Sequence, residues 1–159
     1  MESTEKKTRQ LTVNAAFLKD IKDDNHDLKT ILDRITPLAQ HKQIAANHWP
    51  ELSGLWGDLR DQLALHFSLE EAYGYFDDAI THAPQLTASA ESLRSDHAKL
   101  FERIRALADK AAEIPGDAVE KIGRVLEDYE AFRADFARHE EGELKLILDA
   151  LDDDLGVGD

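Results

Sequence analysis

Apolar residues recur at alternating spacings of three and four along four long segments of this sequence. Because an α-helix completes one turn in about 3.6 residues, this spacing places the apolar side chains on one face of a helix. The segments run from about Asn14 to Ile35, from Pro50 to Ile80, from Gln85 to Ala112 and from Asp117 to Leu151. Four amphipathic helices with short connections predict an all-α fold, an antiparallel up-and-down four-helix bundle.

The breaks between these segments carry helix-stopping or polar residues. Pro37 ends or kinks the first helix, and residues 41–47 are expected to form a polar linker. Asp117, followed three residues later by Glu120, predicts a capping box at the start of the last helix. The four helices should therefore be separate elements with defined ends.

Composition and charge exclude several classes of protein. The formal net charge of −14 repels phosphate backbones and anionic lipids, so we expect no nucleic-acid partner and no membrane partner. The sequence has no Cys, which excludes disulfides, thiolate catalysis and iron–sulfur clusters. It lacks an apolar stretch typical of a secretory signal or a membrane span, which predicts a cytoplasmic location. We expect residues 1–159 to form one domain, with a polar tail at about 1–11 and a frayed end at about 152–159.

Three His and two Glu occupy positions on the apolar faces where an apolar side chain is expected. They are His66, Glu70, His97, His139 and Glu143. A buried ionised carboxylate is unfavourable by several kcal/mol unless it is paired or binds a metal. A lone His/Glu pair is usually a surface ion pair, and a lone core His is usually a hydrogen-bonded residue. Two identical pairs together with a third His are much harder to explain in that way.

The spacing of these residues favours a shared metal centre. His66 and Glu70 are four residues apart, as are His139 and Glu143, so each pair lies on one face of its helix. In an up-and-down bundle the second and fourth helices are diagonal and parallel, so the two pairs face each other and His97 projects between them. Imidazole and carboxylate suit iron, manganese or zinc, and two carboxylates that can bridge favour a dinuclear centre.

Several neighbours of these residues have a predicted role. Glu71 and Glu140 follow the site positions in the sequence, and we expect both to point away from the centre. Tyr73 lies one turn beyond Glu70 and could hydrogen-bond a metal ligand or a bound oxygen species. It could equally be a core Tyr whose hydroxyl contacts water. Phe136 and nearby Leu side chains are expected to keep water from the centre.

The order of these motifs resembles the hemerythrin-like family, also called HHE cation-binding domains. That family has a His on the first helix, His-x-x-x-Glu on the second, His on the third and His-x-x-x-Glu on the fourth. The matching segments are "LALHFSLEEAYGYF", "SLRSDHAKLFERI" and "FARHEEGELKLI", within a span from about Phe17 to Leu151. The resemblance implies a non-haem di-iron centre bridged by the two Glu carboxylates and an oxygen species. It also implies oxygen binding, oxygen or iron sensing, or handling of nitric oxide or peroxide.

The sequence departs from the family pattern in two places. Oxygen-carrying members have a second His four residues after the third-helix His, where this chain has Phe101, so sensing or redox chemistry is favoured over oxygen transport. On the first helix, at about 100° per residue, Asn25 lies on the apolar face and His26 points to solvent. Asn25 would then ligate weakly or hold a metal-bound water. The alternative is a local bulge that brings His26 to the metal.

These features bear on four hypotheses for the function. A ferritin-like di-iron protein is rejected, because no His here has a Glu three residues before it. The leading hypothesis is a di-iron protein that binds oxygen, nitric oxide or a related small ligand for sensing, buffering or redox response. The second is a di-iron redox enzyme that acts on peroxide or oxygen. The third is a metal-free helical interaction module, against which the carboxylates on the apolar faces argue.

Overall fold

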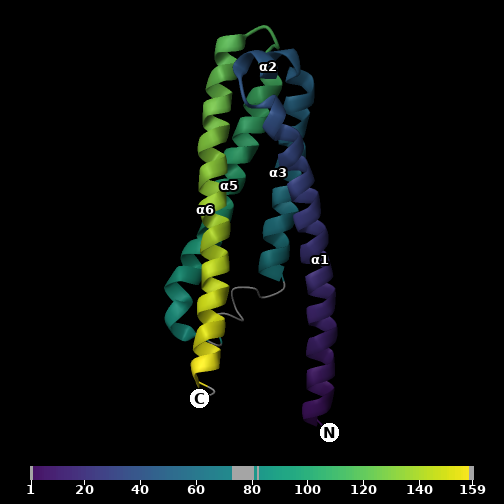
Figure 1. Cartoon of the computed structure of the whole chain (residues 1–159), viewed down its shortest axis with the longest axis vertical. Helices are drawn as coiled ribbons and strands as arrows, with labels where there is room; N and C mark the ends of the chain where they lie inside the picture. Colours follow the sequence, from purple (N-terminus) through teal and green to yellow (C-terminus); the bar gives the residue numbers. More distant parts are fainter. Residues whose placement is uncertain (1, 73–80, 82, 158–159) are drawn as a thin grey trace.

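The structure, a computed structural model, describes residues 2–72, 81 and 83–157 (Figure 1). Its regular elements over these residues are helices, without a strand. The long helices are α1 (Glu2–Leu38), α3 (Trp49–Ala72), α5 (Thr87–Glu113) and α6 (Val119–Val157), and the short ones are α2 (Lys42–Asn47) and the 3₁₀ helix η1 (Pro84–Leu86). The prediction of an all-helical bundle is confirmed.

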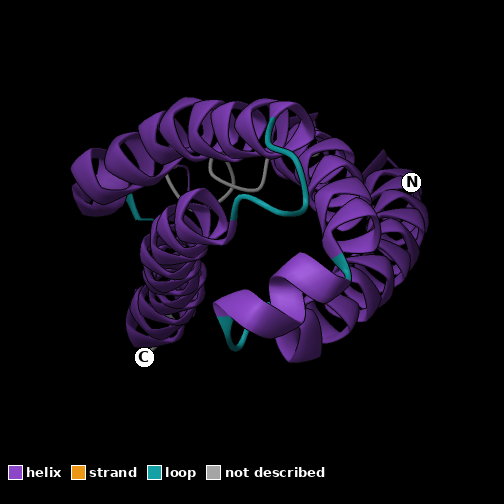
Figure 2. Ribbon diagram, turned by 90° about the horizontal axis from the view of Figure 1, so that it is seen from above, coloured by secondary structure: helices purple, strands orange, loops and turns teal. Residues whose placement is uncertain are grey.

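Successive long helices run in opposite directions around a common interior (Figures 1 and 2). α1 packs along α3, α3 along α5, and α5 along α6. α1 and α6 are therefore the two ends of this row, and α2 packs against α6 near one end of the molecule. Within the described residues, no helix combines the length and the apolar character needed to cross a membrane.

The helix bounds differ from the predicted ones at both ends of the chain. α1 begins at Glu2 rather than near Asn14, and α6 continues to Val157 rather than ending near Leu151. Residues 2–13 contain neither Gly nor Pro, so nothing in their sequence stops the helix from extending. Pro37 lies inside the last turn of α1 and ends the helix one residue later. The predicted end of the second helix, near Ile80, lies outside the described residues.

The connections are more ordered than the sequence predicted. Residues 42–47, expected to be a linker, form α2, where the Gln43 amide donates to Nδ1 of His41 at 3.1 Å. The predicted capping box of Asp117 and Glu120 is wrong, because α6 begins at Val119. Glu120 instead accepts a hydrogen bond from Nζ of Lys42 at 2.8 Å, which ties α6 to α2.

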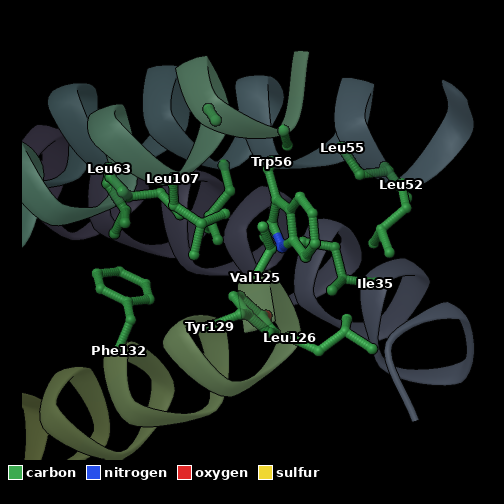
Figure 3. Close-up of a cluster of buried hydrophobic side chains, with 14 of the residues drawn as sticks. Ile35, Leu52, Leu55, Trp56, Leu63, Leu107, Val125, Leu126, Tyr129 and Phe132 are labelled. Carbon is green, nitrogen blue, oxygen red and sulfur yellow. The ribbon is translucent and has the colours of Figure 1, made fainter. Parts of the chain in front are cut away.

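Two apolar clusters lie on either side of the polar residues of interest. The larger one fills the interior between the four long helices, with Trp56, Leu63, Val125 and Phe132 among its fully buried members (Figure 3). Burying each such side chain stabilises the fold by about 1.5–3 kcal/mol. The smaller cluster consists of Ala83, Ala90, Leu146 and Ala150. Along α5 and α6, the polar residues His97, His139 and Glu143 come between these two clusters.

Candidate metal centre

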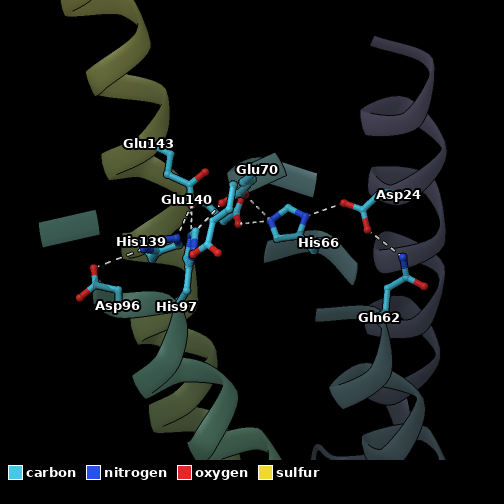
Figure 4. A network of polar contacts seen from close by, with 10 residues as sticks. Asp24, Gln62, His66, Glu70, Asp96, His97, His139, Glu140 and Glu143 are labelled. Atoms are coloured by element: carbon cyan, nitrogen blue, oxygen red, sulfur yellow. Dashed lines mark hydrogen bonds and ion pairs between the residues drawn. The ribbon is translucent and has the colours of Figure 1, made fainter. Parts of the chain in front are cut away.

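The five polar residues predicted on the apolar faces are all buried, with 3–6% of each residue exposed. Two helical turns of α3 supply His66 and Glu70, α5 supplies His97, and α6 supplies His139 and Glu143. Their side chains converge from three helices in the interior (Figure 4). The sequence pattern therefore placed all five at one point of the core, although their role as metal ligands stays a prediction.

The Glu70 carboxylate joins two of the three imidazoles. Its Oε1 lies 2.7 Å from Nε2 of His66, and its Oε2 lies 2.8 Å from Nε2 of His97. Oε1 of Glu143 contacts Nε2 of His139 and lies 3.7 Å from Nε2 of His97. All three imidazoles thus direct Nε2 toward the glutamates.

Within the described part of the chain, these atoms form two groups that could each hold a metal ion. Glu70, His97, His139 and Glu143 form one group, and His66, Glu70 and Glu140 form the other. In each group the ligand atoms lie within 4.8 Å of one another. Glu70 belongs to both groups, so one carboxylate can contact two ions.

Unsatisfied polar atoms in the first group show that this donor set fits a cation. Glu70 Oε2, His139 Nε2 and Glu143 Oε1 are buried without a well-aligned hydrogen bond, although they lie at ion-pair distance from their neighbours. Buried polar atoms nearly always have a partner, and leaving one without a partner is unfavourable by about 1–3 kcal/mol. A cation between these atoms would supply that partner.

Each site histidine has a carboxylate at its other ring nitrogen. Nδ1 of His66 lies 2.5 Å from Oδ2 of Asp24, Nδ1 of His97 lies 3.2 Å from Oε1 of Glu71, and Nδ1 of His139 lies 3.3 Å from Oδ2 of Asp96. An ionised carboxylate only accepts hydrogen bonds, so each Nδ1 carries the proton and donates it. This arrangement leaves Nε2 as the nitrogen available to a metal, a pattern that recurs at metal-binding histidines.

A known protein family matches most of the chain. The family described as hemerythrin HHE cation binding domain matches residues 16–151. The chain belongs to this family. The matched span agrees with the predicted one, from about Phe17 to Leu151, and the family's cation-binding character agrees with the buried His and Glu groups. No curated protein and no solved structure matches the chain significantly.

The carboxylates of this hemerythrin domain hold its histidines as cations when no metal is bound. Burial disfavours the charged form of His66, but hydrogen bonds to Asp24, Glu140 and Glu70 outweigh it and raise its pKa to about 12. The pKa of His97 rises to about 10, because its contacts with Glu143 and Glu70 likewise exceed the effect of burial. Burial raises the pKa of Glu70, but its hydrogen bonds with His66 and His97 lower it by more, so the net shift is downward.

Aromatic rings of the larger apolar cluster contact the centre of the hemerythrin domain directly. Phe67 stacks on His97 with ring centroids 4.3 Å apart, and meets His139 edge-on at 5.9 Å. Phe136 meets His66 edge-on at 6.1 Å. The sequence predicted that Phe136 shields the centre, but it did not predict this role for Phe67. Phe67 directly follows His66 in the sequence, and an apolar residue next to a core position on a helix often borders the same interior.

The first helix differs from the prediction by one residue. Asp24 is buried, with 4% exposed, whereas Asn25 and His26 are exposed. The prediction that Asn25 faces the centre is wrong, and the prediction that His26 points to solvent is confirmed. Ile21 and Leu28 are seven residues apart, so the apolar pattern alone fits either residue 24 or residue 25. Contacts with α3 decide between them: Asp24 accepts from Gln62 at 2.8 Å and pairs with His66.

Of the two carboxylates next to the predicted ligands, Glu140 points to the centre, and the prediction that it points away is wrong; Glu71 contacts only the outer nitrogen of a site histidine. Oε1 of Glu140 lies 2.9 Å from Nε2 of His66, and Glu71 contacts His97 as described above. A glutamate side chain is long enough to reach around the flank of a helix from a position about 100° from the inward face. Tyr73 lies outside the described residues.

A cleft of about 350 Å³ reaches the centre between α1 and α6. His66 and Glu70 lie on its α3 wall, Asp24 on its α1 wall, and Glu140 and Glu143 on its α6 wall. The cleft follows from the helix order, because α1 and α6 are the two ends of the row of packed helices. A small molecule could therefore reach the His66 group from outside.

Proposed function

We propose that this chain is a non-haem di-iron protein, built as an antiparallel up-and-down four-helix bundle, that binds oxygen, nitric oxide or a related small ligand. The binding would serve sensing, buffering or a redox response. The observation that carries the proposal is the sharing of Glu70 between two groups of metal-binding side chains. A carboxylate that contacts both groups supports two ions in one centre rather than two separate sites.

The kind of ligand atoms supports iron. The two groups offer imidazole nitrogens and carboxylate oxygens, a mixed set that suits iron, manganese or zinc, and the chain has no Cys. Membership of the hemerythrin family favours iron among these metals. Bound iron would supply one-electron redox chemistry and open coordination positions for a small molecule.

The surroundings support a small ligand. Phe67 and Phe136 cover the centre on the side of the large apolar cluster, which limits the access of water from that side. The cleft between α1 and α6 gives access from the other side. A histidine that binds metal through Nε2 would lose the proton from that nitrogen and keep the proton on Nδ1, which a carboxylate such as Asp24 accepts.

A di-iron redox enzyme that acts on peroxide or oxygen is the alternative, and the same cleft favours it, because a substrate of that size could enter and leave. Steady turnover of peroxide by the iron-loaded protein would support the enzyme. Reversible ligand binding without turnover would support the binding protein. A cytoplasmic location stays a prediction of the sequence.

Metal analysis of the purified protein tests the proposal. After expression with added iron, we expect about two iron ions per chain and near-ultraviolet absorption of the oxidised centre. Glu70→Ala and Glu143→Ala should each lose most of this iron, because their carboxylates are 6% and 3% exposed and face the histidines. Glu141→Ala is the matched control, because Glu141 is exposed and its substitution removes the same charge. Metal-free wild-type protein, or equal losses from all three variants, would contradict the proposal.

A further inference from the structure

The two groups at the centre differ in how strongly they enclose an ion. Glu70, His97, His139 and Glu143 are all buried, whereas the second group contains Glu140, whose side chain is 38% exposed. We propose that Glu140 is a ligand of the second metal position, together with His66 and Glu70. This inference rests on the proposed metal function and names a ligand that the sequence pattern did not predict.

The distances in the second group suit a bound ion. Nε2 of His66 lies 2.7 Å from Oε1 of Glu70 and 2.9 Å from Oε1 of Glu140. Metal bonds to imidazole nitrogen and carboxylate oxygen are about 2.1 Å long, so ligand atoms at right angles around one ion are about 3 Å apart. The side chains of the second group are thus arranged close to the spacing that one ion requires.

Among the side chains of α1 that the structure describes, none takes an equivalent ligand position. Asn25 and His26 are exposed, and the Asp24 carboxylate is occupied by Nδ1 of His66 and by the Gln62 amide. α1 therefore holds His66 in place from its outer nitrogen. The coordination position that a first-helix side chain would take is left to Glu140, which comes from α6 on the other wall of the cleft.

The position of Glu140 on α6 explains why it joins only the second group. It follows His139 directly, so it lies about 100° around the helix from the residues that face α5. Its carboxylate reaches His66 on α3 at the edge of the cleft, where half-exposed side chains retain freedom to move. Three protein ligands leave open coordination positions there, so the second ion should bind more weakly and be the one that meets the small ligand.

Metal titration of the metal-free full-length chain tests this assignment. Fe²⁺ is added without oxygen, and Co²⁺ is added in parallel because its visible absorption reports coordination. We expect wild-type protein to bind about two ions, and Glu140→Ala to keep the tighter one while its second site weakens at least tenfold. Glu140→Gln, which keeps the side-chain volume, should weaken the same site. Glu141 lines the same cleft, and Glu141→Ala removes the same charge. This control variant should bind both ions as wild type does.

The outcomes separate this inference from the proposed function. Wild-type protein that binds no metal would overturn both. Two ions bound by wild type and by Glu140→Ala with equal affinities would overturn the role of Glu140 and leave the di-iron proposal intact. Loss of both ions from Glu140→Gln at unchanged helix content would also overturn it, because Glu140 belongs to the second group alone.

Discussion

The position of each imidazole is set by carboxylates at both ring nitrogens, and the two sides have different roles. One or two carboxylates lie at Nε2 in the interior, and another lies at Nδ1 toward the outside, as Asp24 does for His66 at 2.5 Å. The inner carboxylates can share a cation with the ring, whereas the outer ones fix the ring's orientation and its proton. Asp24 is itself buried and fixed by Gln62, so it is the most constrained of the outer partners.

We predict that Asp24→Asn lowers metal affinity by about 10–100-fold, because His66 loses its charged partner at Nδ1. The side chains are nearly equal in volume, so the fold should persist. Competition with a coloured chelator measures the affinity. Asp23→Asn, an exposed change one residue earlier, is the control and should have no effect. If both variants bind metal equally well, Asp24 does not position His66.

The stability of the metal-free protein should fall as the pH rises from about 6.5 toward 10. The folded pKa values of His66 and His97, about 12 and about 10, lie above their ordinary value of 6.5. Their charged forms therefore stabilise the fold below pH 6.5, and this contribution is lost as the pH rises through the folded values. Glu70 acts in the opposite direction: its lowered pKa contributes stability that is lost as the pH falls below 4.5.

Urea denaturation of the metal-free protein at pH 6.5 and at pH 9 measures this effect, with the lower pH expected to give the higher free energy of unfolding. His66→Gln should reduce the pH dependence, because it removes one of the two groups whose pKa is raised. Stability that rises over this interval would contradict the assigned pKa shifts. Metal affinity should follow the reverse trend, because protons compete with the metal for Nε2.

At the scale of the helices, much of the fold follows from apolar spacing. Leu63, Ile104 and Val125 are fully buried members of the apolar pattern, which the sequence shows because the spacing along a helix decides which side chains share a face. The alternative faces of the first helix differ by one residue, and only contact with Gln62 and His66 selects Asp24. The reach of a flanking side chain such as Glu140 likewise depends on where the neighbouring helix lies, which the sequence alone does not specify.

The register of α3 can be tested with two leucines. Leu63 is fully buried, and we expect Leu63→Ala to lower the free energy of unfolding by about 2–5 kcal/mol through lost burial and a cavity. Leu65 is 49% exposed, and Leu65→Ala should change it by at most about 0.5 kcal/mol. Denaturant unfolding of both variants provides the measurement. Equal effects would show that α3 is rotated from the described orientation.

At the scale of the whole molecule, the residues of the candidate metal centre come from three helices and lie between two apolar clusters. Metal that binds only the folded state should stabilise it, by about 2.7 kcal/mol when free metal exceeds Kd one hundredfold. Removal of metal by a chelator should therefore lower the melting temperature, as measured by circular dichroism. Glu143→Ala should show little further change on chelation, because it has already lost the ion. An unchanged wild-type melting temperature would show that the centre is not occupied in solution.

The measurement that tests the central claim most directly is iron X-ray absorption on the purified, iron-loaded chain. It reports the ligand atoms and any second iron atom close by. We predict nitrogen and oxygen ligands and an iron–iron distance of at most about 4 Å, because both groups share Glu70. Scattering from a single iron, with no second metal nearby, would contradict the account of a dinuclear centre.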